Sequence, residues 1–103
     1  MIITTTSTIE GSPIRKYLGI ATGEVIMGAN VFRDFKASIT DLVGGRSRVY
    51  EGKLQEARDA AFAEMTQKAS VMGANGIVGV DIDYEVIREG MLMVVVSGTA
   101  VIV

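Results

Sequence analysis

The segment that most constrains the fold is the carboxyl-terminal stretch Met91–Val103, which is apolar on both faces of a predicted strand. Apolar residues occupy alternate positions on each face: Met93, Val95 and Val101 on one, Leu92, Val94, Val96 and Ile102 on the other. Successive side chains of a strand point to opposite faces, so this run predicts a strand that is covered on both sides. The helices of one small chain are too few to cover both faces, which predicts a homo-oligomer.

Composition supports the same prediction. The chain has 103 residues, which indicates one domain spanning 1–103, and 49% of them are hydrophobic while 21% are charged. One small core cannot hide so much apolar material, and large exposed apolar patches are rare on monomers. A membrane is excluded by length, because the longest uncharged stretch, Gly90–Val103, is shorter than the roughly 20 residues of a spanning helix.

The location and the class of partner follow from charge and cysteine content. The amino terminus lacks the basic lead and the long apolar region of a signal peptide, and the absence of cysteine gives the cytoplasm as the expected location. The net charge is −2, and Arg15-Lys16 is the only adjacent basic pair. Nucleic-acid binding normally needs a basic stripe, so no nucleic-acid partner is expected.

The pattern along the chain predicts an α+β fold with an antiparallel sheet and the element order β-β-α-α-β-β. The predicted elements are a strand from Met1 to about Thr8, a strand over Ile14–Met27, a short helix from Val31 to Leu42 or Val43, a long helix from Ser47 to about Met72, a strand over Gly76–Ile87, a hairpin turn at Arg88–Gly90 and the final strand. Gly44-Gly45 is expected to stop the first helix, and Gly73 to close the second.

Small residues mark a predicted close contact between the second strand and another element. Gly19, Ala21 and Gly23 fall on one face of this strand, opposite the bulky Leu18 and Ile20. Small residues on a strand face indicate that a helix or another chain approaches closely. The long helix carries alanines on its apolar stripe (Tyr50, Leu54, Ala57, Ala61, Met65, Ala69 and Met72), which allows its axis to lie close to a sheet.

Several segments, in order along the chain, resemble one family. They are Phe32–Ile39, Gly44–Ser47 with Tyr50-Glu51, Gly73–Asn75, Gly79–Glu85 and Ser97–Val101. The set is similar to the YbjQ-like proteins, an uncharacterised bacterial group labelled "putative heavy-metal-binding domain". The resemblance implies an α+β subunit of dodecin-like outline in a ring, expected to be a pentamer. It carries over no catalytic residues.

The heavy-metal label fits the residue types poorly. Soft and borderline metals prefer Cys and His, and this chain has neither. Its six methionines are the only soft donors, and five of them fall in predicted strands or helices, where methionine usually fills a core: Met27, Met65, Met72, Met91 and Met93. The best alternative is a row of carboxylates at Asp81, Asp83 and Glu85, which project from one strand face about 6.5–7 Å apart. Hard cations such as Ca²⁺ or Mg²⁺ take such oxygens. The favoured explanation of the row is a solvated strand face that Arg or Lys from a neighbour neutralises, since charged outer faces are ordinary for antiparallel sheets.

A second candidate site lies where the long helix is expected to begin. Free backbone N–H groups at a helix start attract anions, and Gly45, Arg46, Ser47 and Tyr50 are the expected contacts for a small anionic ligand. The spacing and lysine of a phosphate-binding P-loop are missing. The competing explanation is that the glycines and Ser47 only cap helices, with Arg46 pairing to an acid across a subunit interface.

No catalytic set is visible. The chain has no histidine to activate a serine or threonine, and nothing in the spacing selects a carboxylate or lysine base. The sequence therefore predicts a non-enzymatic homo-oligomer without a cofactor. It is expected to bind a small ligand or a protein at its subunit junctions, with cation binding as the alternative.

Overall fold

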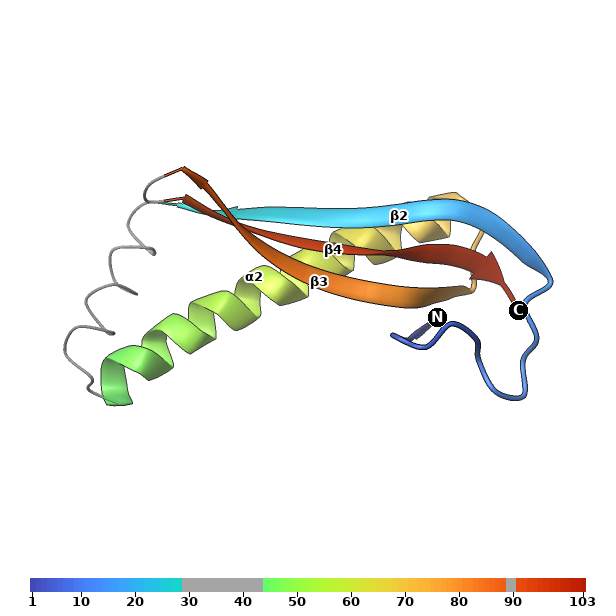
Figure 1. The fold of residues 1–103 in the computed structure, drawn as a ribbon, viewed down its shortest axis with the longest axis horizontal. Helices are drawn as coiled ribbons and strands as arrows, with labels where there is room; N and C mark the ends of the chain where they lie inside the picture. The colour runs from blue at the N-terminus through green and yellow to red at the C-terminus, as the bar shows by residue number, and fades with distance from the viewer. Residues whose placement is uncertain (29–43, 89–90) are drawn as a thin grey trace.

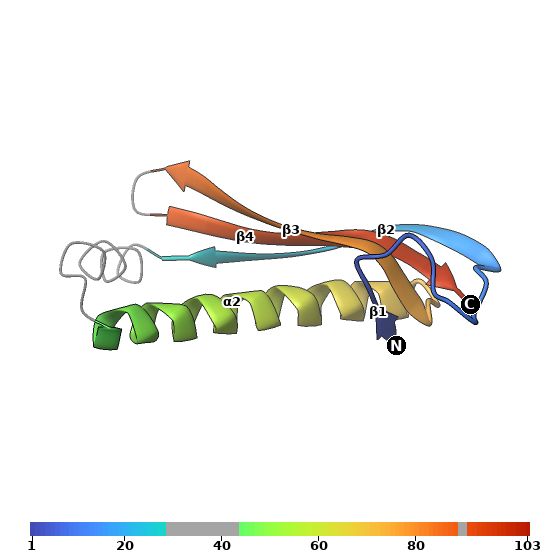
Figure 2. The same cartoon turned by 60° about the horizontal axis from the view of Figure 1, so that its bottom comes forward.

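The computed structural model describes the backbone of residues 1–28, 44–88 and 91–103, with side chains from residue 51 onward in the second range. Its elements in chain order are β1 (Ile2–Ile3), β2 (Lys16–Met27), α2 (Gly44–Val71), β3 (Gly76–Arg88) and β4 (Met91–Ile102). The predicted short helix over Val31–Val43 lies outside the described residues. Figures 1 and 2 show two layers, a long twisted sheet and the helix α2 along one of its faces.

The sheet has the strand order β1-β3-β4-β2. β4 pairs antiparallel with both β2 and β3, whereas β1 pairs parallel with the start of β3. β2 and β3 therefore run in the same direction on either side of β4. α2 packs mainly on β2 and less on β4, so β3 lies beside the helix rather than under it. Figure 2 shows β3 diverging from α2 toward its carboxyl end.

The helix and the sheet meet through small residues, as the sequence predicted. A Cβ built on Gly23 of β2 would lie 1.8 Å from the backbone oxygen of Ala61 in α2. Ala57, Ala61 and Ala69 are buried on the helix stripe together with Met65. Alanine and glycine bring the two backbones this close, and the surrounding core then forms from the larger side chains of β3 and β4.

The final strand is covered on both faces only in part. Val94, Val96 and Ala100 point toward α2 and are fully buried. On the other face, Val101 is also fully buried, next to the position where Gly76 meets the side chain of Ile9. The remaining residues of that face, from Met93 to Thr99, are half-buried. The prediction of two apolar faces is confirmed, and the amino-terminal segment covers one end of the face opposite the helix.

The predicted fold class is wrong in two respects. The sheet is mixed and not antiparallel, because β1 runs parallel to β3. The described residues contain one helix, so their order is β-β-α-β-β and not β-β-α-α-β-β. The dodecin-like antiparallel outline is therefore not retained. The parallel pairing was hidden from sequence reasoning because β1 is only two residues long and its partner begins at Gly76, far along the chain.

Two element boundaries differ from prediction by three residues or more. The first strand ends at Ile3 and not near Thr8, since threonine hydroxyls bond locally: the Thr6 amide donates to Thr4 Oγ1 (3.1 Å), and Thr6 Oγ1 donates to the Thr8 carbonyl (2.6 Å). Such bonds compete with sheet pairing. The long helix begins at Gly44 rather than at Ser47. Glycine is an acceptable residue at a helix start. The helix that Gly44-Gly45 was expected to stop lies outside the described residues.

The carboxyl end of α2 follows the prediction. The helix ends at Val71, and Gly73 adopts a φ of +92°, the left-handed conformation expected of a helix-closing glycine. Within residues 1–28, 44–88 and 91–103, no helix combines the length and the apolar character needed to cross a membrane.

Candidate functional site

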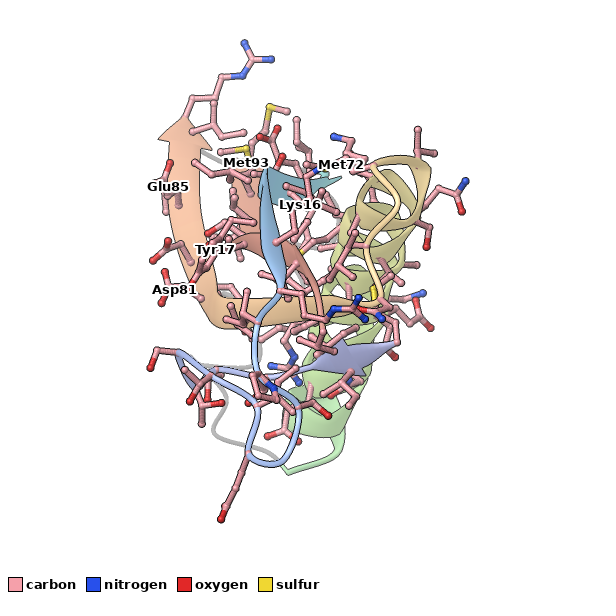
Figure 3. The ribbon with its side chains drawn as sticks, turned by 90° about the vertical axis from the view of Figure 1, so that its right-hand side faces the viewer. Lys16, Tyr17, Met72, Asp81, Glu85 and Met93 are labelled. Carbon is pink, nitrogen blue, oxygen red and sulfur yellow. The ribbon has the colours of Figure 1, made fainter. Side chains whose placement is uncertain are left out.

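The three predicted carboxylates lie on the sheet face that is turned away from α2, which we call the open face. The register of β3 with β4 places Asp81 opposite Ser97, Asp83 opposite Val95, and Glu85 opposite Met93. All three acidic side chains are exposed. In Figure 3, Asp81 and Glu85 point to the side opposite the helix, as does Tyr17 of β2. The predicted alternation of β3, with acids on one face and apolar residues on the other, is confirmed.

Asp83, at the centre of this row, has a raised pKa. The main cause is a hydrogen bond in which the protonated carboxyl of Asp83 donates to Asp81; repulsion from the charges of Asp81 and Glu85 acts in the same direction. The residues facing the row across β4 are uncharged. The three carboxylates therefore form a row of concentrated negative charge, in which the central group, Asp83, holds its proton to a higher pH than an ordinary aspartate.

The row does not form a ready metal site within one subunit. Among the described residues, no three His, Cys, Asp or Glu side chains are grouped closely enough to hold an ion. Soft metals fit least, because the chain has no His or Cys and two of its methionines, Met27 and Met65, are buried in the core. A hard cation would find two neighbouring carboxylates here, those of Asp81 and Asp83, and would need further ligands from water or from another subunit.

The predicted anion contacts belong to the first two turns of α2. Gly45, Arg46 and Ser47 follow directly on the helix start at Gly44, and Tyr50 lies one turn further on. The side chains of these residues lie outside the described part of the chain. Their backbone position agrees with a helix N-terminus, while Ser47 lies inside the helix rather than at its predicted cap.

A second surface lies on the α2 side of β3, where the helix does not reach. Ile82, Tyr84 and Val86 point to this side and remain 37%, 44% and 63% exposed. We call these three residues the outer strip. One polar contact ties it to the helix: Nη1 of Arg58 donates to the Tyr84 hydroxyl at 3.2 Å. Large apolar side chains in a contiguous exposed row mark an interaction surface.

A groove of about 320 Å³ lies between β2 and the opposite flank of α2. We call it the edge groove. Its walls are formed by Val25, Met27, Lys53, Glu56, Ala57 and Ala60. Helix geometry places Lys53, Glu56 and Ala60 on the flank away from Arg58, and hence away from β3. The groove is therefore at the outer edge of β2, beside which the described residues place no further strand. Apart from Lys53 and Glu56, which pair with each other (Nζ to Oε2, 3.7 Å), its lining is apolar.

The outer strip and the edge groove were not identified from the sequence, although a signal for them was present. The small residues of β2 match the alanines of α2, and that match requires the helix to lie over β2. A helix placed over one edge strand leaves the apolar face of the other edge strand uncovered. The sequence placed the residues of the strip correctly on one face of β3. It did not predict that the position of the helix would leave this face uncovered.

Comparison with known proteins shows the family. A family model described as "Putative heavy-metal-binding" matches residues 1–103. The UPF0145 protein of Geobacillus kaustophilus is 60% identical over 98% of this chain and 96% of its own, and a UPF0145 protein of Bacillus cereus is 63% identical over 98% of both. The names of these relatives state no activity.

A solved structure is similar in fold. It is a protein of unknown function from the DUF74 family of Pediococcus pentosaceus, with a TM-score of 0.60, 20% identity, and coverage of 100% of this chain and 97% of that chain. At this identity the likeness concerns the fold alone. The full-length family match and the high identity of the UPF0145 proteins agree with the resemblance seen in the sequence, and the chain belongs to the YbjQ family.

Proposed function

We propose that this protein acts as the subunit of a homo-oligomer and works by binding rather than by catalysis. The observation that carries the proposal is the outer strip, whose three large apolar side chains lie on a strand that α2 leaves uncovered. Two further large side chains on the open face, Ile20 and Ile26, are 77% and 54% exposed. Surfaces of this kind on a small domain are normally buried between subunits.

The proposed assembly is a ring, with a pentamer as the expected size, and its junctions are the proposed binding places for a small anionic ligand or a protein. The first turns of α2, with Gly45, Arg46, Ser47 and Tyr50, are the proposed ligand contacts. The support is that the N-terminus of a helix of 28 residues carries a partial positive charge and N–H groups that have no acceptor within the helix itself.

Size-exclusion chromatography with light scattering tests the assembly. We expect a mass that is a multiple of the subunit mass of 11.0 kDa, and five times that mass for the pentamer. A stable species of one subunit mass at micromolar concentration would contradict the proposal. The same purified sample, screened by thermal shift against inorganic phosphate, nucleotides and organic acids, tests the ligand. A flat screen would remove the ligand from the proposal and leave the assembly.

A second candidate function is the binding of a hard cation by Asp81, Asp83 and Glu85. The specific observation in its favour is that the Asp81 and Asp83 carboxyls are close enough to share a hydrogen bond, which raises the pKa of Asp83. A divalent cation neutralises this repulsion, and a ring would repeat the row in every subunit. The family description also points to metal, although the donor types favour Ca²⁺ or Mg²⁺ over a heavy metal.

Carboxyl titration by NMR tests the cation candidate. Without metal, we expect the Asp83 pKa to lie above that of an ordinary aspartate. Because the Asp83 pKa is raised in the folded state, the folded protein binds this proton more tightly than the unfolded chain does. The resulting contribution to folding stability is fully present below the unfolded pKa and is lost as the pH rises through the folded pKa. Added Ca²⁺ should lower the Asp83 pKa by competing with the proton. Asp81→Asn should lower it too and abolish the response to Ca²⁺. A titration curve that Ca²⁺, Mg²⁺ and Zn²⁺ all leave unchanged excludes this function.

A further inference from the structure

The two edges of the sheet differ in a way that makes them complementary. From Asp81 to Arg88, the outer backbone edge of β3 makes no hydrogen bond to the described residues, because the amino-terminal segment pairs only as far as Val80. At the opposite edge, β2 has no further strand among the described residues. One edge therefore presents the protruding outer strip, and the other presents the edge groove. A free strand edge is a template for pairing with another chain.

We propose that the edge groove of one copy accepts the outer strip of the next copy, with β3 pairing along the free edge of the neighbouring β2. This inference rests on the proposed homo-oligomer and identifies the surfaces that join its subunits. The strip and the groove both lie on the α2 side of the sheet. Placing β2 of the next copy beside β3 brings the next α2 alongside Ile82, Tyr84 and Val86. Each helix then covers its own β2 and β4 and its neighbour's β3.

The chemistry of the two surfaces matches. The strip offers two aliphatic side chains and one aromatic ring, and the groove offers aliphatic walls from Val25, Met27 and two alanines. Alanine on this flank of the helix leaves room for the larger side chains of a partner. The Lys53–Glu56 pair lies at the groove with both side chains more than half exposed, so docking would not bury an unpaired charge.

The acidic row distinguishes the pairing of β3 with β2 from a symmetric contact in which β3 pairs with β3 of another copy. If two β3 edges paired antiparallel with each other, the open-face acids of one strand would lie opposite those of the other, and like charges directly opposite are destabilising. On the open face of β2, the row would instead meet Ile20, Thr22, Glu24 and Ile26, which contribute a single carboxylate. The charge pattern therefore favours the head-to-tail contact of β3 with β2.

Head-to-tail contact has a defined geometry. When the rotation axis runs along the strands, each strand keeps its direction from one copy to the next; β2 and β3 run the same way within a subunit, so the new pair is parallel. Such a heterologous contact uses two different surfaces of each copy and produces a closed ring when the rotation closes.

Cross-linking tests the inference directly, since the chain has no cysteine. Val86→Cys places a thiol on the strip, and Ala60→Cys places one at the groove. When the two variants are mixed, reassembled and treated with a short bismaleimide, we expect a covalent dimer. Neither variant alone should give one, because a head-to-tail contact never brings two copies of the same position together. Dimer formation by Val86→Cys alone would show β3 pairing with β3 and overturn the inference while leaving the oligomer intact.

A bismaleimide could also join two thiols that lie near each other without being in contact. A pair of helix variants tests the contact without a cross-linker. Ala60 and Ala63 are both exposed positions of α2, but only Ala60 lines the groove. We expect Ala60→Arg to reduce the light-scattering mass toward one subunit and Ala63→Arg to leave it unchanged, with both variants keeping wild-type circular dichroism. Equal masses for the two variants would overturn the groove as the contact. A wild-type protein of a single subunit mass would instead remove the homo-oligomer itself.

Discussion

Gly23→Ala should destabilise this protein more than any other single-methyl change we can identify. The added Cβ would lie 1.8 Å from the Ala61 carbonyl oxygen, 2.8 Å from its carbon and 2.9 Å from the Met65 nitrogen. All three atoms belong to the backbone of α2, so no side-chain rotation relieves the clash and the helix must move off the sheet. We expect the free energy of unfolding to fall by about 3 kcal/mol, the upper end of the usual cost of overpacking.

Urea denaturation at one fixed protein concentration measures this effect, because the stability of an oligomer depends on concentration. Two glycines serve as matched controls. Gly28→Ala and Gly52→Ala place their Cβ atoms where no atom of the described residues lies within 4 Å. Gly28→Ala should be close to neutral, and Gly52→Ala should stabilise by about 1 kcal/mol because Gly52 lies inside α2. A Gly23→Ala protein as stable as the Gly28→Ala protein would show that the helix and strand are not in such close contact.

The close contact at Gly23 also explains which parts of the fold could be predicted from the sequence. Local patterns were sufficient for the alternation of β3, the two apolar faces of β4, the alanine stripe of α2 and the closing glycine at position 73. Each of these depends on periodicity or on one backbone conformation. The parallel pairing of β1 could not be predicted, because a two-residue strand has no measurable period and its partner is remote in sequence. The early end of β1 depends on threonine hydroxyls that bond locally instead of extending the strand.

The candidate surfaces show a similar division. The acidic row was predicted residue by residue, since alternate positions of a strand must share a face. The raised pKa of Asp83 could not be predicted from the sequence, because it depends on the side-chain conformations that bring Asp81 within hydrogen-bonding distance. The outer strip and the edge groove depend on the lateral position of α2 over the sheet. That position follows from long-range packing between Gly23 and Ala61, which periodicity within one segment does not report.

Val86→Lys should dissociate the assembly without unfolding the subunit. Val86 is 63% exposed in the isolated chain, so a lysine there is tolerated by the monomer. In the proposed contact the same position lies against the apolar walls of the edge groove. Docking would then lose the apolar burial of the valine, worth about 1.5–3 kcal/mol for a fully buried side chain, and would also have to desolvate an ammonium group. A ring repeats this cost at every junction, so we expect the light-scattering mass to fall to that of one subunit.

Val71→Lys provides the control for this change. Val71 is 79% exposed at the end of α2 and belongs to neither the outer strip nor the edge groove. It receives the same charge and loses the same side chain, so it should keep the wild-type mass. Both variants should retain wild-type circular dichroism, and only Val86→Lys should lose the dependence of its melting temperature on protein concentration, because a monomer unfolds without a change in molecularity. If Val86→Lys remained assembled, β3 would not be the joining strand, and the open face with Ile20 and Ile26 would become the first apolar surface to test among the described residues.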